Sequence, residues 1–189
     1  MIDDLYSQLK EDSNIGIACL YADYKDQSSQ TVVHILGSFL RQFLTTAQEL
    51  IPEEVIQKLQ NIRHQGTKVG TDDILSLLKI RLHQFKHTFI CIDAVDELEP
   101  TIRQQLFKVL KELVTNNTRL FLTGRHHIES EVQKYLQVMQ KYRVDISATQ
   151  QDIQEFVTQQ IMNDLNPEAM DEVLAKDTAD IIIEKSQGM

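Results

Sequence analysis

The fold is decided by His87-Thr88-Phe89-Ile90-Cys91-Ile92-Asp93-Ala94-Val95-Asp96-Glu97-Leu98, an apolar run that ends in three carboxylates. The residues from Phe89 to Ile92 are continuously apolar, which is typical of a strand covered on both faces in a parallel sheet. Carboxylates cannot follow such a strand into the interior, because burying an unpaired charge is energetically expensive. The sequence therefore predicts a buried strand with Asp93, Asp96 and Glu97 where it emerges.

Two interpretations of these acids are open. In open α/β sheets ligands bind at the carboxyl edge of the strands, and grouped acids there suggest Mg²⁺ with phosphate oxygens. Alternatively, Asp96, Glu97 and Glu99 form the acidic first turn of the following helix and are stabilised by its dipole. The spacing alone does not distinguish the two.

Strands and helices alternate on both sides of this stretch. Apolar runs at residues 16–22 and 118–124 predict two further strands, and the alternating pattern at 142–147 predicts a strand nearer an edge. Helical periodicity predicts helices over residues 2–12, 31–46, 53–64, 71–85, 100–114, 128–139, from Thr149 or Gln151 to Asn166, and 170–185. This order implies an α/β fold whose parallel sheet has crossover helices.

Composition narrows the class of protein. The chain has 189 residues, 42% of them hydrophobic, so it can bury a substantial core. The net charge is −9 and the basic residues are scattered, so we expect no nucleic-acid partner. The sequence shows neither a signal-peptide pattern nor a run of 18 apolar residues, which favours a cytoplasmic protein without a membrane partner.

The cysteines and histidines give weaker signals. Cys19 and Cys91 both lie inside apolar runs, as expected for reduced thiols in a core rather than for a disulfide or a zinc site. His126 and His127 with Glu129 look like a metal cluster. Adjacent side chains point apart on a helix or a strand, however, so a metal site is not favoured there.

The exits of the three strands carry a family resemblance. Asp23 follows the first strand, Asp93 to Glu97 the second, and Thr123-Gly124-Arg125 the third. This order resembles the NACHT-type nucleotide-binding domain of the STAND class of P-loop NTPases, most closely its nephrocystin-like N-terminal branch. The family's Walker B segment has a small residue after the magnesium aspartate and acids three and four positions on, which Ala94, Asp96 and Glu97 match. The family's usual Thr-Ser-Arg-Pro is similar to residues 123–126, where Gly124 and His126 differ.

The resemblance implies a three-layer P-loop NTPase-like parallel sheet with flanking helices. Asp93 would hold Mg²⁺ through water, Glu97 or Asp96 would polarise an attacking water, and Arg125 would sense the terminal phosphate of ATP or GTP. Full-length relatives act as regulatory switches joined to repeat or effector domains. The resemblance also divides the chain into a partial NTPase core, residues 1–148, and the start of a helical region, residues 149–189. Arg125 alternatively serves only as a solvated surface base.

A Walker A loop requires Gly-x-x-x-x-Gly-Lys-Ser/Thr, whose amides and lysine hold phosphates, and the sequence contains no Gly-Lys pair. The stretch from Gly66 to Gly70 has neither the required spacing nor a preceding strand. In the family the phosphate loop lies just upstream of the first helix of this sequence. We therefore expect an incomplete domain without the phosphate-loop strand, which belongs between residues 120–123 and 144–147, and no hydrolysis by this chain alone.

Two alternatives to the nucleotide switch remain. Open sheet edges pair readily with other chains, so the chain would serve as an interaction module that associates with a full-length relative through its vacant edge. The other alternative is a nonfunctional remnant.

Overall fold

The computed structural model describes residues 14–27, 29–46, 51–65, 68–137, 142–163 and 172–186. The predicted helix over residues 2–12 and the start of the last helix at residue 170 lie outside these ranges. The described elements are β1 (Ile15–Tyr21), the 3-10 turn η1 (Tyr24–Asp26), α2 (Val32–Thr46), α3 (Glu53–Gln65), α4 (Thr71–Leu82), β2 (His87–Asp93), η2 (Val95–Glu97), α5 (Pro100–Leu113), β3 (Thr118–Leu122), η3 (His126–Ile128), α6 (Glu129–Leu136), α7 (Gln150–Met162) and α8 (Glu172–Ser186).

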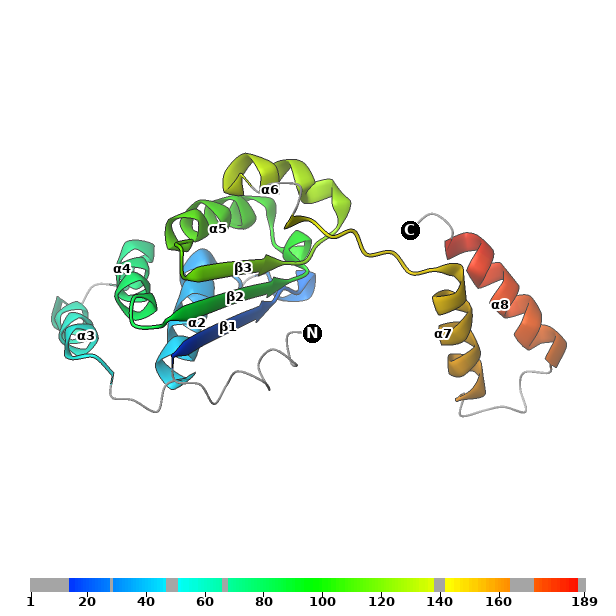
Figure 1. Cartoon of the computed structure of the whole chain (residues 1–189), viewed down its shortest axis with the longest axis horizontal. Helices are drawn as coiled ribbons and strands as arrows, with labels where there is room; N and C mark the ends of the chain where they lie inside the picture. The colour runs from blue at the N-terminus through cyan, green and yellow to red at the C-terminus, as the bar shows by residue number, and fades with distance from the viewer. Residues whose placement is uncertain are drawn as a thin grey trace. The chain divides into compact units, whose positions relative to one another are not determined.

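The three strands form one parallel sheet in the order β1-β2-β3 (Figure 1). In the register Cys19 lies opposite Cys91, and Cys91 lies opposite Phe121. Parallel neighbours cannot be joined by a tight turn, and here the connections contain helices, with α2, α3 and α4 before β2 and α5 before β3. An α/β fold with a parallel sheet flanked by helices is thereby confirmed.

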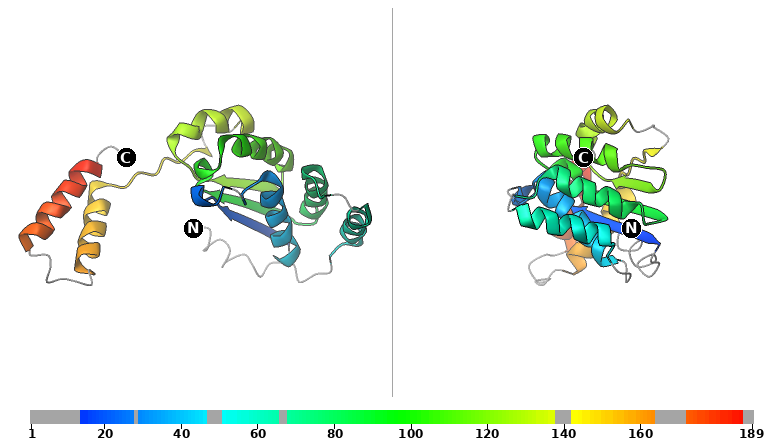
Figure 2. Two further views of the ribbon diagram at one scale, coloured as in Figure 1. Left: turned by 180° about the vertical axis from the view of Figure 1, so that it is seen from behind. Right: turned by 90° about the vertical axis from the view of Figure 1, so that its left-hand side faces the viewer.

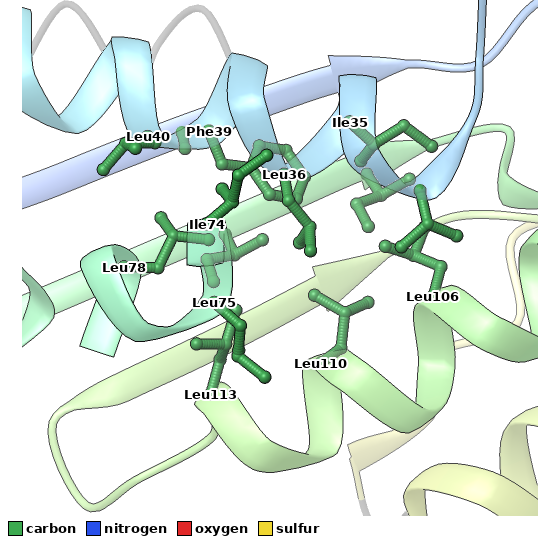
Figure 3. Packing of buried hydrophobic residues seen from close by; sticks show 14 of the residues in the cluster. Ile35, Leu36, Phe39, Leu40, Ile74, Leu75, Leu78, Leu106, Leu110 and Leu113 are labelled. Carbon is green, nitrogen blue, oxygen red and sulfur yellow. The ribbon is translucent and has the colours of Figure 1, made fainter. Parts of the chain in front are cut away.

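One face of the sheet is covered by α2, α4 and α5 (Figure 2). Ile90 and Ile92 of β2 point to this face and are 1% and 0% exposed. Leucine and phenylalanine side chains from the three helices meet over them, as Figure 3 shows for part of the cluster. Each fully buried aliphatic side chain contributes about 1.5–3 kcal/mol by leaving water, so this face contributes strongly to the sheet's stability.

The opposite face of the sheet carries both cysteines. Cys19 and Cys91 are reduced thiols, as predicted, with Cys91 buried and Cys19 half-buried. A hydrogen bond with Cys19, together with burial, raises the pKa of Cys91. A raised pKa keeps Cys91 a thiol, which suits a packing role better than a reactive one. Phe121, next in this row, is 39% exposed.

The two outer strands differ at their free edges. The side-chain amide of Gln42 on α2 accepts from the Cys19 N–H at 2.8 Å and donates to the Cys19 carbonyl at 2.9 Å. At Cys19 it therefore takes up the two backbone groups that a neighbouring strand would bind. On β3, Thr123 N–H donates to Ile92 O, so Leu120 and Leu122 direct their backbone groups away from β2. Among the described residues nothing pairs with those outward groups.

The chain divides into two compact units, residues 1–138 and 139–189. The second unit begins with the segment predicted as a fourth strand, and that prediction is wrong, since residues 143–149 have no regular secondary structure. Val144 is 80% and Ile146 is 83% exposed. An extended segment becomes a strand only when a neighbour takes up its N–H and C=O groups, and no described strand pairs with this one. The proposed domain boundary after residue 148 stays a prediction.

Helices α7 and α8 form the rest of the second unit. A capping box begins α7, in which Thr149 Oγ1 accepts from the Asp152 N–H at 3.1 Å and the Asp152 carboxylate accepts from the Thr149 N–H at 2.8 Å. The hydrogen bond from the Thr149 hydroxyl to the Asp152 carboxylate is the largest cause that lowers the pKa of Asp152, and the bond from the Thr149 N–H adds to it. The pair leaves apolar side chains uncovered, with Phe156 62% and Ile181 52% exposed. Within the described ranges, no helix is both long and apolar enough to span a membrane.

Candidate functional site

Asp93, the last residue of β2, has its carboxylate fixed by the neighbouring strand. The Thr123 hydroxyl, just beyond β3, donates to Asp93 Oδ1 and accepts from the Ala94 N–H at 2.9 Å. The Thr123 carbonyl also accepts from the Val95 N–H at 2.9 Å. Because a hydroxyl that both donates and accepts has a single useful rotamer, Thr123 sets the direction of the carboxylate at the sheet edge.

The backbone turns sharply after Asp93. Ala94 has a φ of 52°, in the left-handed region that favours glycine, and the 3-10 turn η2 follows it. Alanine is unbranched at Cβ, so it is less strained at such a position than a β-branched or bulky residue. The fully buried Val95 anchors the turn in the core, which leaves Asp96 and Glu97 at the sheet edge.

The Asp96 side chain contacts the loop after β3. Its side chain is only 6% exposed, and Oδ1 accepts from the Arg125 backbone N–H at 3.2 Å. Arg125 Nε lies 3.6 Å from Asp96 Oδ2, while the Arg125 side chain remains 79% exposed. The predicted residues Asp96 and Arg125 are thus brought together, and Asp96 acts on Arg125 rather than standing free.

Glu97 faces the loop after β1. The Tyr24 N–H donates to Glu97 Oε2 at 3.2 Å, and the Ala22 N–H donates to the Asp93 carbonyl at 3.0 Å. Asp23 begins η1 by accepting from the Lys25 N–H at 2.9 Å. The exits of all three strands therefore meet at one edge of the sheet, where Asp93 and Glu97 are half-buried.

Of Asp96, Glu97 and Glu99, only Glu99 belongs to the N-terminus of α5, as its N-cap and not as part of its first turn, which contains no acid. Glu99 is the N-cap of α5, and its carboxylate accepts from the Thr101 hydroxyl and from the Thr101 and Ile102 N–H groups. The hydrogen bond from the Thr101 hydroxyl is the largest cause that lowers the pKa of Glu99. Asp96 and Glu97 precede the helix in η2, so they do not form its first turn.

Gly124 allows the β3 loop to lie close to η2. A Cβ atom there would lie 2.8 Å from Ile128 Cδ1, 3.2 Å from Val95 Cγ1 and 3.4 Å from Asp96 Oδ1. The first two distances are too short for carbon atoms in contact, so a larger residue would require Ile128 to move. This close approach gives a physical reason for glycine between Thr123 and Arg125.

Two residues of this region were missed by sequence reasoning. Thr123 joins the exits of β2 and β3. The family resemblance includes Thr123 but assigns it no role, and a hydroxyl at a strand end does not by itself identify its partner. Arg103 lies beneath η2 with its side chain 5% exposed and binds Glu131 on α6. Its signal was stronger, because Arg103 shares the buried stripe of α5 with Leu106, Phe107 and Leu110, where a charge requires a partner.

A metal held by protein side chains alone is not supported. The described residues contain no group of three or more His, Cys, Asp or Glu side chains that could hold a metal ion, and this applies to His126, His127 and Glu129 as well. Asp93 still fits one kind of ion. Mg²⁺ commonly takes only one or two carboxylates and completes its shell with water and substrate phosphates, and Asp93 Oδ2 has no partner among the described residues.

Comparison with known proteins gives one match. No curated protein and no solved structure matches the chain. A family model described as "Nephrocystin 3, N-terminal" matches residues 1–125, which include the whole sheet and the sheet edge from Asp93 to Arg125. Since the match covers well over half of the 189 residues, the chain belongs to the nephrocystin 3 N-terminal domain family.

Proposed function

We propose that this chain supplies the metal- and water-binding side of a nucleotide site in a NACHT-like P-loop NTPase domain of the STAND class. The observation that carries the proposal is the meeting of three strand exits at one sheet edge, with Asp93 set by Thr123, Arg125 beside Asp96, and Glu97 beside the β1 loop. Such carboxyl edges are where open α/β sheets bind ligands. ATP or GTP is the expected nucleotide.

Each residue of the edge has a proposed role. Mg²⁺, when bound, would neutralise phosphate charge, and Asp93 would hold it through water. Glu97 is the better candidate to orient a water molecule, because the Asp96 carboxylate is nearly buried and already accepts from Arg125. Arg125 keeps an exposed guanidinium that suits contact with a terminal phosphate.

Hydrolysis by this chain alone is not expected. The sequence has no Gly-Lys pair, and without that loop neither backbone amides nor a lysine hold the β and γ phosphates. We therefore assign a regulatory rather than a catalytic role. A repeat or effector domain would respond to the nucleotide state, in a cytoplasmic setting.

A nucleotide titration followed by NMR tests the proposal. Mg·ATP or Mg·GTP at millimolar concentration should shift the amide signals of Ala94, Glu97 and Arg125, and Asp93→Asn should abolish the shifts. Asp72→Asn is the matched control, because Asp72 is an exposed acid in the first turn of α4. Shifts that are absent, or that persist in Asp93→Asn, would refute the site. Phosphate release should equal the blank, and turnover lost on Glu97→Gln would contradict the predicted lack of hydrolysis.

A second candidate function is association with another protein chain through the edge of β3. Gln42 pairs with Cys19 on the outer edge of β1, whereas the described residues offer no partner to the outward backbone groups of Leu120 and Leu122. An open edge of this kind adds a strand from another polypeptide. We propose a full-length relative of the same family as that polypeptide.

Light scattering over a range of protein concentrations tests this second function. Phe121→Lys places a charge on the edge strand β3 and should prevent association, because lysine on edge strands disfavours pairing with another chain. Val69→Lys is the control, because Val69 is similarly exposed at 44% but lies before α4. A chain that stays monomeric at every concentration, alone and with a full-length relative, would exclude the β3 edge as an interface.

A further inference from the structure

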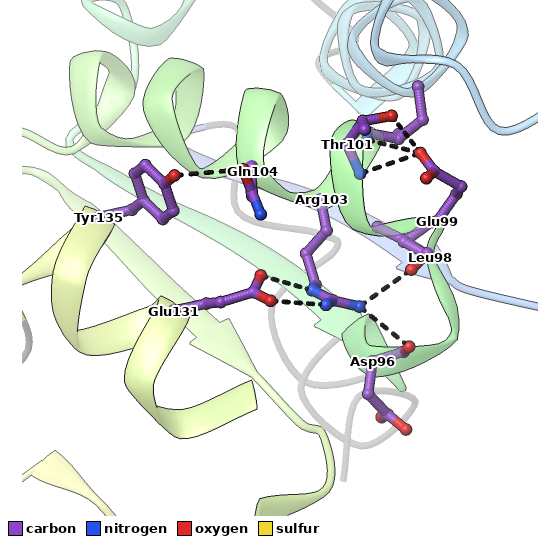
Figure 4. Close-up of polar contacts among 9 residues, drawn as sticks. Asp96, Leu98, Glu99, Thr101, Arg103, Gln104, Glu131 and Tyr135 are labelled. Carbon is purple, nitrogen blue, oxygen red and sulfur yellow. Dashed lines mark hydrogen bonds and ion pairs between the residues drawn. The ribbon is translucent and has the colours of Figure 1, made fainter. Parts of the chain in front are cut away.

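Arg103 is a charged side chain inside the molecule with nearly all of its donors in use. Its Nε and Nη2 donate to the two Glu131 carboxylate oxygens, both at 2.9 Å. Its Nη1 donates to the carbonyls of Asp96 at 3.2 Å and Leu98 at 3.0 Å (Figure 4). A guanidinium has five N–H donors, so this arrangement leaves little freedom for the side chain to move.

The groups that Arg103 binds belong to two different parts of the candidate site. The Asp96 and Leu98 carbonyls are on the turn that presents Asp96 and Glu97. Glu131 is in the first turn of α6, the helix that follows Arg125 and η3. Asp96 also connects η2 directly to the loop after β3, because its carboxylate accepts from the Arg125 N–H while its carbonyl accepts from Arg103. The buried Arg103 therefore connects η2, which carries Asp96 and Glu97, to α6, which follows the loop that contains Arg125.

Stability alone does not explain a charge at this position. Arg103 shares its side of α5 with Leu106 and Phe107, which are fully buried. An apolar residue at position 103 would extend that stripe, and replacing a buried ion pair by apolar residues is often neutral or stabilising. The pairing is also strong in both directions, since the hydrogen bonds with Glu131 raise the pKa of Arg103 and those with Arg103 lower the pKa of Glu131.

We propose that Arg103, locked by Glu131, is a positioning residue that fixes Glu97 and Arg125 relative to each other at the sheet edge. The proposal rests on the nucleotide site proposed above, but the geometry it predicts is measurable without nucleotide. Arg103 and Glu131 are not among the residues to which the proposed site assigns a contact with Mg²⁺, water or phosphate. Both act through the backbone of η2 and through α6.

Amide hydrogen exchange measured by NMR tests the positioning role. In Glu131→Gln the carboxylate lock is weakened while the side-chain size is kept, and in Arg103→Lys the charge is kept while the forked geometry is lost. We expect the amides of Tyr24 and Arg125, which donate to Glu97 and Asp96, to exchange about tenfold faster in both variants. The amide of Thr88, which donates to Asn117 O at the opposite end of β2, should not change.

Glu112→Gln is the matched control, because Glu112 forms the exposed ion pair with Lys79 that joins α5 to α4. It should leave the Tyr24 and Arg125 amides unchanged. Exchange that rises equally at Thr88, Tyr24 and Arg125 would show a merely structural role and overturn the proposal, as would no change at all. If the site amides respond but the wild-type chain ignores Mg·ATP and Mg·GTP, the positioning role stands and the nucleotide function fails.

Discussion

β2 and the segment of residues 142–148 differ in what surrounds them. β2 has a parallel strand on each side and helices over one face, and Ile92 is 0% exposed. The segment has apolar residues at alternate positions and runs as an extended chain in Figure 1, yet Ile146 is 83% exposed. Neighbours that accept hydrogen bonds and exclude water make a strand, and an apolar pattern alone does not. The turn after β2 also has such neighbours, since Thr123 accepts hydrogen bonds from the Ala94 and Val95 N–H groups.

Truncating one isoleucine in each region gives the largest expected difference. Ile92→Ala should lower the free energy of unfolding by about 2–5 kcal/mol, because it leaves a cavity in a packed core. Ile146→Ala removes the same atoms from a solvated side chain and should change that free energy by less than about 0.5 kcal/mol. Urea denaturation followed by far-UV circular dichroism measures both. A loss above about 1 kcal/mol for Ile146→Ala would mean that residues 142–148 are paired in solution.

Two threonines test whether hydrogen bonding orders the end of β2. Thr123→Val removes the hydroxyl that joins Asp93 to Ala94 and should destabilise the chain by about 1–3 kcal/mol, because the Ala94 N–H loses its acceptor. Thr88→Val makes the same change at a buried hydroxyl for which the described residues provide no partner. It should leave stability unchanged or raise it by up to about 1 kcal/mol. Thermal melts measure the change in stability of both variants. Equal losses of stability in Thr123→Val and Thr88→Val would mean that Thr123 acts only by packing.

Local patterns predicted most of the fold. The strands around Ile17, Ile90 and Leu120 were identified from apolar runs, and most of the described helices from their apolar stripes and breakers. The predicted helix to residue 85 ends at Leu82, and the helix predicted from 128 to 139 is the shorter α6. Such ends depend on packing and caps, so a periodicity places them only within a few residues.

Partners far apart in the chain set the limit of sequence reasoning. Residues that emerge at the carboxyl ends of parallel strands had to share an edge, which is why Asp96 and Arg125 could be expected near each other. The bonds between Thr123 and Asp93 and between Arg103 and Glu131 join residues 30 and 28 positions apart. A hydroxyl or a guanidinium has many possible partners at such separations. The wrong prediction of a fourth strand has the same cause. Residues 142–147 have the alternating apolar pattern of a strand, but whether they form one depends on a neighbouring strand that the pattern does not reveal.

Acid should weaken the ordered loop through Glu131. Its pKa is lowered by the hydrogen bonds from Arg103, so its contribution to stability is present above the ordinary glutamate pKa, about 4.3, and is lost as the pH falls through the lowered folded value. Glu131→Gln should lower the free energy of unfolding by about 1–2 kcal/mol near pH 7, because the amide still accepts one hydrogen bond. The difference from wild type should shrink below about pH 4.

Urea denaturation at a series of pH values measures that effect, with Glu112→Gln as the control. The ion pair of Lys79 and Glu112 is exposed, with side chains 44% and 54% accessible, and exposed pairs contribute about 0–1 kcal/mol. Its loss should be small at every pH. If the difference in free energy of unfolding between wild type and Glu131→Gln is independent of pH, the carboxylate charge does not hold Arg103. The order of η2 would then not depend on this ion pair.

The smallest expected effect concerns the turn itself. Ala94 and Gln137 are the described non-glycine residues with positive φ, at 52° and 54°. Gln137 ends α6, where glycine is the usual residue, so Gln137→Gly should stabilise the chain by up to about 1 kcal/mol. Ala94→Gly should give a similar gain if the strain is only conformational. A smaller gain, or a loss, in thermal melts would mean that the Ala94 methyl group contributes packing that holds η2 and, with it, Glu97.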